Sequence, residues 1–332
     1  MPAARPCRSF VKQLKAMTPL INGLHHITAL ADDPQKNLDF YAGILGLRLV
    51  KKTINFDAPD VYHLYYGNED GAPGTIMTFF PYSGIQRGRQ GKGQLTVTSF
   101  SIPANSLGYW TERLKKFNIP FQQPQERFGE GFIYFEDPDG LGIELIATDK
   151  DQRKGFTYGQ VEEDHAVKGF HSITLSEDGY EKTAGLLSSY MNHTKISEAG
   201  NRFRYSASGN IGDIVDVVCE PERPRGLQGA GTIHHVAFST DSDDTINQMQ
   251  ARLANAGMHV TQVLDRQYFH SIYFREPGGV LFEVATNPPG FAIDEEKSKL
   301  GEALKLPSWE EPNRSRIEKG LIPIQLDWKK YL

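Results

Sequence analysis

The feature that most constrains the fold is an internal repeat. Residues 23–28 read GLHHIT and residues 169–174 read GFHSIT. An acidic turn and an amphipathic segment follow each run, over 33–45 in the first copy and over 180–190 in the second. A strand-like run followed by apolar residues at helical spacing predicts a strand that leads into a helix. The same unit of secondary structure is therefore predicted twice.

A second pair of similar segments marks where units end. Residues 135–144 (FEDPDGLGIE) match residues 274–283 (FREPGGVLFE), and in each segment proline and glycine separate two runs of strand composition. This pattern predicts a β-hairpin. A predicted strand and helix precede each hairpin, so the chain contains four units of one helix and several strands. The predicted limits of these units are 22–85, 94–148, 168–221 and 231–287.

The size of the unit predicts how the units associate. One helix and three or four strands cannot bury a sheet face alone, whereas two paired units close a cupped sheet over a shared concavity. The predicted fold class is therefore α+β, with four βαβββ units forming cupped mixed sheets in two domains. The predicted boundaries are an N-terminal extension 1–21, a first domain 22–148, a linker 149–167, a second domain 168–287 and a C-terminal tail 288–332.

The strand predicted over 280–285 (VLFEVA) carries a carboxylate, Glu283, among apolar residues. Burying an unpaired carboxylate costs several kcal/mol, so a positive partner is expected to face it. His235 begins the first strand of the same unit, and His26 holds the equivalent position in the first unit. Two histidines and one carboxylate form the facial triad typical of non-haem Fe(II) enzymes, which leaves three coordination positions open. His26, His235 and Glu283 are therefore predicted to bind one metal ion.

The other two units provide an internal comparison. Ser172 and Thr98 are aligned with the two histidines, while Glu144 keeps the carboxylate. In the first unit, Met77 and Thr78 stand where a carboxylate would be. We therefore predict one metal site, in a concavity shared by units one and four, and no metal role for Glu144.

Several motifs together resemble a known superfamily. The LHHIT opening at 24–28, the EPGG hairpin that ends in Glu283 and the four-unit arrangement resemble the vicinal-oxygen-chelate superfamily of glyoxalases, bleomycin resistance proteins and extradiol dioxygenases. Within it, the runs at 62–67 (YHLYYG), 73–78 (PGTIMT) and 234–238 (HHVAF) resemble the hydroquinone-type ring-cleaving dioxygenases. The resemblance extends over nearly the whole chain.

The resemblance implies further site residues. Tyr273 and Arg266 are expected to line the pocket, and His25, Thr28 and His234 to belong to a hydrogen-bond network around the metal. Strict alternation along a strand would instead aim His25 and His234 away from the concavity. The remaining histidines have no comparable partners and are interpreted as ordinary residues: His63, His165, His171, His193, His259 and His270. A site role is left open only for His270, because it lies near Tyr273 in the sequence.

The function implied is that of a non-haem Fe(II) dioxygenase, with Mn(II) as the alternative metal. Its substrates would be a small hydroquinone-type aromatic compound and O2. A glyoxalase-like isomerase or lyase and a metal-free protein that binds aromatic ligands are the alternatives. Zinc isomerases of the superfamily would require a fourth protein ligand, and its absence from the first unit favours oxygen chemistry.

Composition excludes other classes of function. Thirty-six basic and 41 acidic side chains give a net charge of -5, so nucleic acid is not an expected partner. No stretch approaches the roughly 20 apolar residues that span a bilayer. Cys7 and Cys219 are expected to be free thiols in the cytoplasm. Residues 1–31 lack acidic side chains, which is typical of transit peptides, so organelle targeting is left open. Homo-oligomer formation is also left open.

Overall fold

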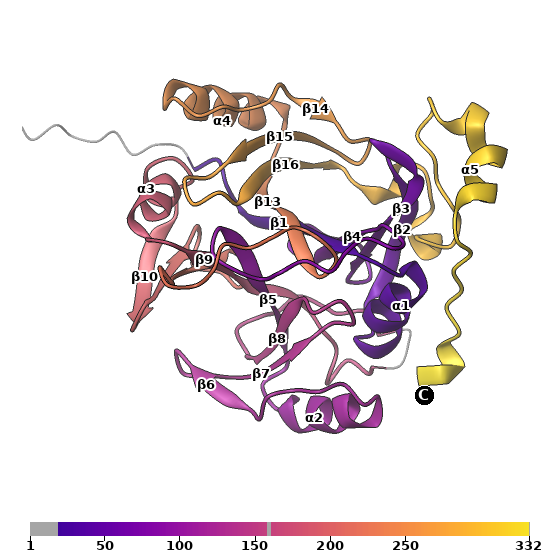
Figure 1. The fold of residues 1–332 in the computed structure, drawn as a ribbon, viewed down its shortest axis with the longest axis horizontal. Helices are drawn as coiled ribbons and strands as arrows, with labels where there is room; N and C mark the ends of the chain where they lie inside the picture. Colours follow the sequence, from indigo (N-terminus) through magenta and orange to yellow (C-terminus); the bar gives the residue numbers. More distant parts are fainter. Residues whose placement is uncertain (1–18, 158–160, 332) are drawn as a thin grey trace, which may run out of the picture.

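The computed structural model describes residues 19–157 and 161–331 (Figure 1). Most of the predicted N-terminal extension, including Cys7, lies outside the described residues. Sixteen strands form two mixed sheets of eight strands each. Helices α2, α3 and α4 lie at the outside of these sheets, and the C-terminal tail runs along one side.

The first sheet combines the first and fourth predicted units. β1 pairs antiparallel with β13, and each of these strands pairs in parallel with the last strand of its own unit, β4 or β16. The strand order is β14-β15-β16-β13-β1-β4-β3-β2. The bounds are β1 Gly23–Ala31, β2 Arg48–Asn55, β3 Ala58–Gly67, β4 Ile76–Pro81, β13 Thr232–Thr240, β14 Leu264–Asp265, β15 Phe269–Arg275 and β16 Leu281–Pro289.

The second sheet combines the second and third units in the same way. β5 pairs antiparallel with β9, and the order is β10-β11-β12-β9-β5-β8-β7-β6. The α+β class with cupped mixed sheets of repeated units is confirmed, whereas the predicted domain limits stay a prediction. The bounds are β5 Gln94–Ile102, β6 Gln125–Arg127, β7 Glu130–Glu136, β8 Gly142–Ala147, β9 Gly169–Glu177, β10 Thr194–Ala199, β11 Arg202–Ser206 and β12 Ile214–Cys219.

A helix follows the first strand of every unit, as the repeat predicts. In α1 (Pro34–Leu38), the side chain of Asp33 caps the first turn by accepting backbone N–H groups. This helix continues as the π-helical segment η1 (Asp39–Ile44), which completes the helix predicted over 33–45. The other three are α2 Leu107–Lys116, α3 Glu181–Ser189 and α4 Asp243–Asn255.

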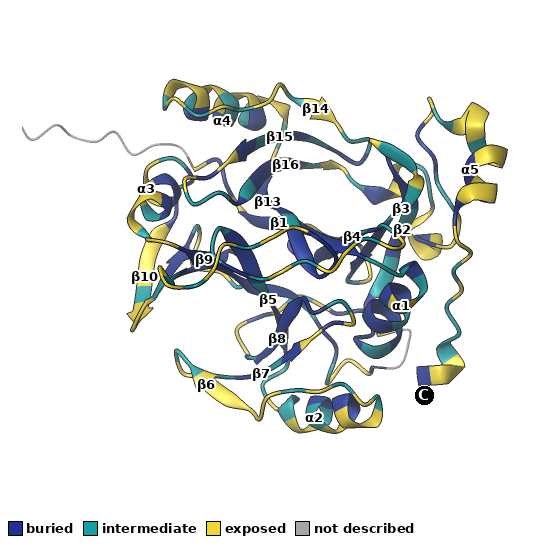
Figure 2. Ribbon diagram, viewed as in Figure 1, coloured by how far each residue is buried: buried dark blue, intermediate teal, exposed yellow. Residues whose placement is uncertain are grey.

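The core lies between the sheets and their helices, where the central strands are buried along most of their length, whereas the edge strands β6, β10 and β14 are largely exposed (Figure 2). The helices bury one side and expose the other, as an amphipathic pattern requires. Within the described residues, the helices are too short and too polar to cross a membrane.

The C-terminal tail closes the free edge of the first sheet. Leu304 forms an isolated parallel β-bridge with Lys52 of β2. The neighbouring Lys51 is fully buried and forms ion pairs with Asp294 and Glu295 of the tail. The tail therefore fixes the side of the first sheet to which β2 and β3 belong. Its elements are η2 Phe291–Ile293, η3 Lys297–Lys299, η4 Glu311–Asn313, α5 Arg314–Gly320 and η5 Trp328–Tyr331.

Candidate active site

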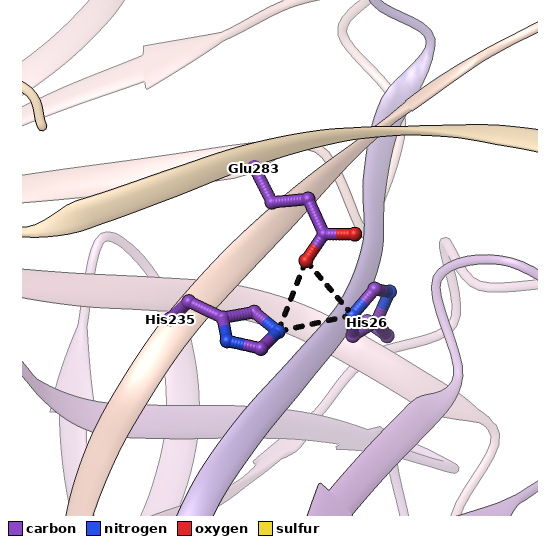
Figure 3. A group of neighbouring side chains, drawn as sticks. All are labelled: His26, His235 and Glu283. Carbon is purple, nitrogen blue, oxygen red and sulfur yellow. Dashed lines mark hydrogen bonds and ion pairs between the residues drawn. The ribbon is translucent and has the colours of Figure 1, made fainter. Parts of the chain in front are cut away.

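The three predicted metal ligands meet in the concavity of the first sheet (Figure 3). The Nε2 atoms of His26 and His235 are 3.3 Å apart. The Oε2 atom of Glu283 lies 3.3 Å from the first and 3.0 Å from the second. All three side chains are buried. Three candidate donor atoms from three strands therefore point at one small volume.

Strand pairing explains why residues so distant in sequence meet. His26 belongs to β1 and His235 to β13, which are the two central and directly paired strands of the sheet. Glu283 belongs to β16, where it pairs with Ala237 of β13. The site thus depends on the association of units one and four, as the sequence comparison of the units predicts.

The chemistry of Glu283 fits a bound cation. Its Oε1 atom accepts a hydrogen bond from the hydroxyl of Ser271, but its Oε2 atom is buried and has no hydrogen-bond partner among the described residues. Burial alone would raise the pKa of Glu283, yet the two imidazoles hold that pKa well below its usual range. Burial lowers the pKa of His235 and favours the neutral ring that binds metals. An ionised carboxylate oxygen between two imidazole nitrogens is a donor set suited to a divalent metal.

The outer histidines each contact one candidate ligand. The Nδ1 atoms of His25 and His26 are 2.9 Å apart, and those of His234 and His235 are 2.8 Å apart. Strict alternation fails at these positions because the β1–β13 pairing skips His25 on one strand and His234 on the other, so each lies at a β-bulge. Burial lowers the pKa of His25 to about 3 and that of His234 to about 4, so both rings are neutral.

A cavity of about 390 Å³ opens beside the three donors. Tyr273 and Arg266 both line it, and the Arg266 Nε–H donates to the Tyr273 hydroxyl at 3.3 Å. Burial and the charge of Glu283 raise the pKa of Tyr273 well above its usual value, so its hydroxyl keeps its proton. At the mouth, Arg266 lies 3.7 Å from Asp57. Aromatic and aliphatic walls complete the cavity: Leu30, Phe56, Phe80, Phe269 and Leu281.

Thr28 belongs to a different set of contacts from the outer histidines. Its hydroxyl lies 2.9 Å from that of Thr78, which lies 2.8 Å from Nε2 of His63. The Nδ1 atom of His63 in turn lies 2.8 Å from the hydroxyl of Tyr65. Thr28 therefore begins a chain of contacts that ends at two residues of the pocket wall.

His63 is the pocket residue that the sequence interpretation missed. The sequence predicts an ordinary histidine at this position, yet His63 lines the cavity with His26 and His235. Burial lowers its pKa well below the usual value. The spacing of His63 and Tyr65 within one strand could have shown that both face the same side. The other histidines called ordinary do not line this cavity.

The second sheet carries ion pairs where the first carries the three donors. Ser172 holds the position of His26, but Val97, and not Thr98, holds that of His235, because Ser99 pairs with Glu144 as Ala237 pairs with Glu283. The alignment of Thr98 was wrong by one residue. Arg127 binds both oxygens of Glu144 at 3.0 and 2.5 Å. Here a guanidinium group satisfies the carboxylate.

Comparisons with known proteins agree with this geometry. A model of the Glyoxalase/Bleomycin resistance protein/Dioxygenase superfamily matches residues 23–145 and 162–284. The Bacillus subtilis protein named "Putative ring-cleaving dioxygenase MhqO" is 47% identical, over 92% of this chain and 97% of its own. The chlorohydroquinone/hydroquinone 1,2-dioxygenase of Sphingobium indicum is 38% identical, over 86% of this chain and 91% of its own.

Solved structures show the same fold. The crystal structure of a "putative dioxygenase" from Bacillus subtilis superimposes with a TM-score of 0.90, at 47% identity, over 93% of this chain and 99% of that one. Glyoxalase I from Zea mays superimposes with a TM-score of 0.61 at 13% identity, over 80% of this chain and 92% of that one, a likeness of fold alone. The same family model matches each half of the chain, which agrees with this fold.

Proposed function

Because the chain belongs to the Glyoxalase/Bleomycin resistance protein/Dioxygenase superfamily, as its motifs predicted, we propose that it is a non-haem Fe(II) ring-cleaving dioxygenase of the extradiol type. The observation that carries this proposal is the buried convergence of His26, His235 and Glu283 beside a cavity with aromatic walls. Such a triad leaves positions open for a substrate oxygen and O2. Mn(II) is the alternative metal.

The register of the first sheet favours oxygen chemistry over isomerisation. Thr28 pairs with Thr78 in the first unit as Ala237 pairs with Glu283 in the fourth. A fourth protein ligand of the isomerase kind would stand at Thr78, where the hydroxyl instead bonds Thr28 and His63. The three-ligand site is therefore more open than the site that the isomerases of this superfamily require.

The metal, when bound, would supply adjacent binding positions and an electron path between a phenolate and O2. The residues of the chain supply binding and proton control. Tyr273 holds the phenolic hydroxyl of the substrate by a hydrogen bond and helps to move the proton of that hydroxyl. The positive charge of Arg266 stabilises negative charge that develops on the substrate oxygen. The outer histidines His25 and His234 fix the orientation of the ligand rings through Nδ1.

The proposed organic substrate is a hydroquinone. One relative is named a chlorohydroquinone/hydroquinone 1,2-dioxygenase, and the cavity combines apolar walls with a few polar groups, as small-molecule pockets usually do. A hydroquinone reaches the metal through one oxygen and needs a protein group to hold it, which Tyr273 provides. The cytoplasmic location and any self-association stay predictions.

The test is anaerobic loading with Fe(II), metal analysis, and oxygen-electrode assays across hydroquinones and catechols. We expect one metal per chain, and oxygen uptake that matches loss of the hydroquinone and depends on Fe(II). A glyoxalase-like isomerase would convert its substrate without oxygen uptake, and a binding protein would bind without turnover. Stoichiometric metal without oxygen uptake on any of these compounds would reject the dioxygenase proposal.

A further inference from the structure

A second buried tyrosine lines the pocket, from a strand on the other side of the ligand strands from Tyr273. Tyr65 of β3 lines the same cavity and is almost fully buried. Its ring packs against the rings of Phe291, in the C-terminal tail, and His63, with ring centroids 5.1 Å and 4.0 Å apart. The tail therefore supports this wall from behind. The proposed function assigns Tyr65 no role.

Strand register makes Tyr65 the counterpart of Tyr273. Tyr65 pairs with Thr78 in the first unit, and Tyr273 pairs with Glu283 in the fourth. Thr78 and Glu283 hold equivalent positions, because each pairs with the residue two places after a ligand histidine. The pocket thus has two tyrosines related by the internal repeat, on β3 and on β15, at either side of the metal ligands.

The hydrogen bond between Tyr65 and His63 can run in either direction, depending on which ring nitrogen of His63 carries the proton. Within the described chain, His63 Nδ1 is the only hydrogen-bond partner of the Tyr65 hydroxyl. Because burial raises the pKa of Tyr65 well above its usual value, the group is an O–H donor, and we assign its proton to the bond with Nδ1. His63 then carries its proton on Nε2 and donates it to Thr78. With its proton in that bond, the hydroxyl oxygen of Tyr65, a residue that lines the cavity, has a free lone pair to offer as an acceptor.

We propose that Tyr65 accepts a hydrogen bond from the second hydroxyl of the hydroquinone, the one that the metal does not bind. His63 is the positioning residue that keeps the Tyr65 hydroxyl proton turned away from the cavity. A hydroquinone carries hydroxyls at opposite ends of its ring, and this pocket carries one tyrosine on each of two walls. The inference rests on the proposed function and adds to it a selection for a hydroxyl donor at the far end of the ring.

The test compares the anaerobic binding of hydroquinone, phenol and 4-methoxyphenol, which differ only at that far end. Calorimetry on the Fe(II)-loaded protein measures binding without turnover. We expect wild type to bind hydroquinone roughly 3- to 10-fold more tightly than phenol, the effect of one hydrogen bond, and to gain nothing from the methoxy oxygen. The variant Tyr65→Phe should bind hydroquinone and phenol alike.

Tyr66→Phe is the matched control. Tyr66 is the next residue of β3, is fully buried, and donates its hydroxyl to Asn37 at 3.0 Å rather than lining the cavity. The control should keep the wild-type preference for hydroquinone, although it loses an equally buried hydroxyl. A Tyr65→Phe protein that keeps the preference would overturn the inference and leave the proposed function intact.

His63→Phe tests the positioning role. The ring centroids of His63 and Phe80 are 4.3 Å apart, and phenylalanine keeps an aromatic ring in that place. It has no nitrogen to accept a hydrogen bond, so the Tyr65 hydroxyl is free to donate into the cavity. We expect 4-methoxyphenol to gain affinity relative to phenol by roughly 3-fold or more, a change that loosened packing would not produce. An unchanged ratio would overturn the role of His63. Failure of the wild type to bind any of the three phenols would instead reject the proposed function.

Discussion

At the scale of single residues, metal binding depends on three side-chain atoms that carry no proton. The Nε2 atoms of His26 and His235 and the Oε2 atom of Glu283 are close together, and each is suited to offer a lone pair. Without a cation, the buried Oε2 atom of Glu283 has no hydrogen-bond partner among the described residues, which is unfavourable. The triad therefore reads as a binding site rather than as a structural ion pair.

Removing any one donor should remove the metal and leave the fold. We expect His26→Ala, His235→Ala and Glu283→Ala each to lower metal affinity by more than about 100-fold, because removing a ligand costs more than removing one of its supporting contacts. Circular dichroism should show retained secondary structure, because the strands that carry these residues are paired along their length. Metal analysis after gel filtration measures the loss, and full occupancy in all three variants would reject the triad.

Tyr273 should affect turnover and not metal content. The change Tyr273→Phe removes the hydroxyl bonded to Arg266. Turnover of hydroquinones should fall by roughly 10- to 10,000-fold, the range for loss of an acid–base or positioning group, with metal retained. We also expect hydroquinones to be better substrates than catechols, which chelate a metal through two oxygens. Wild-type rates in the variant, or efficient cleavage of catechols alone, would contradict this role.

At the scale of elements, two β-bulges decide which histidines reach the metal ligands. The repeated HH pairs could be found in the sequence, and the period of a strand was enough to select His26 and His235. It could not place His25 and His234, because a bulge adds one residue and breaks the alternation. His63 was missed for a related reason: its partner Thr78 comes from a neighbouring strand, which only the pairing register reveals.

Their hydrogen-bond partners separate the residues that the resemblance grouped together. His25→Ala and His234→Ala should each weaken metal binding by roughly 10- to 100-fold, because each contacts Nδ1 of a ligand ring. Thr28→Val should leave metal affinity nearly unchanged, because the Thr28 hydroxyl bonds Thr78. Competition against a chelator measures all three affinities. Equal losses in the three variants would show that the two sets of contacts act as one network.

The second sheet offers the same elements without the metal ligands. Glu144→Gln should leave metal content and activity unchanged, because Ser172 and Val97 provide no imidazole. It should lower the free energy of unfolding by about 1–3 kcal/mol, because Arg127 loses its charged partner in a nearly buried site. Urea unfolding measures the cost. A loss of metal equal to that of Glu283→Gln would mean that the wrong concavity has been assigned.

At the scale of the whole molecule, the two sheets exchange contacts through their hairpin turns. Asp137, after β7 of the second sheet, accepts the hydroxyl of Tyr41 from the first unit at 3.0 Å. Glu276, after β15 of the first sheet, accepts the hydroxyl of Thr183 from α3 at 2.6 Å. Both carboxyl groups are buried. The sequence showed the matching hairpins but not this exchange, because the repeat does not reveal which helix each turn meets.

These contacts make stability depend on pH. Burial raises the pKa of Asp137 to about 7, and burial together with the charge of Glu276 raises the pKa of Glu177, at the end of β9, to about 8. Below the usual carboxyl range the folded and unfolded chains both hold these protons, so the stabilisation is complete. As the pH rises to about 7 and then 8, the unfolded chain has already released the protons, while the folded chain must bury charge. Above about pH 6.5, where the buried histidines are neutral in both the folded and the unfolded chain, the free energy of unfolding should therefore fall until the pH reaches about 8.

Asp137→Asn and Glu177→Gln test this account, because a neutral amide cannot ionise. We expect each variant to flatten part of the decline in stability from about pH 6.5 to about pH 8, and the double variant to flatten most of it. The measurement is urea unfolding of the metal-free protein at several pH values, which keeps metal binding from contributing. Glu126→Gln, at an exposed position of β6, is the control and should keep the wild-type slope. A wild-type slope in the double variant would show that other groups set the pH dependence, and that the buried carboxyls between the sheets are ionised at neutral pH.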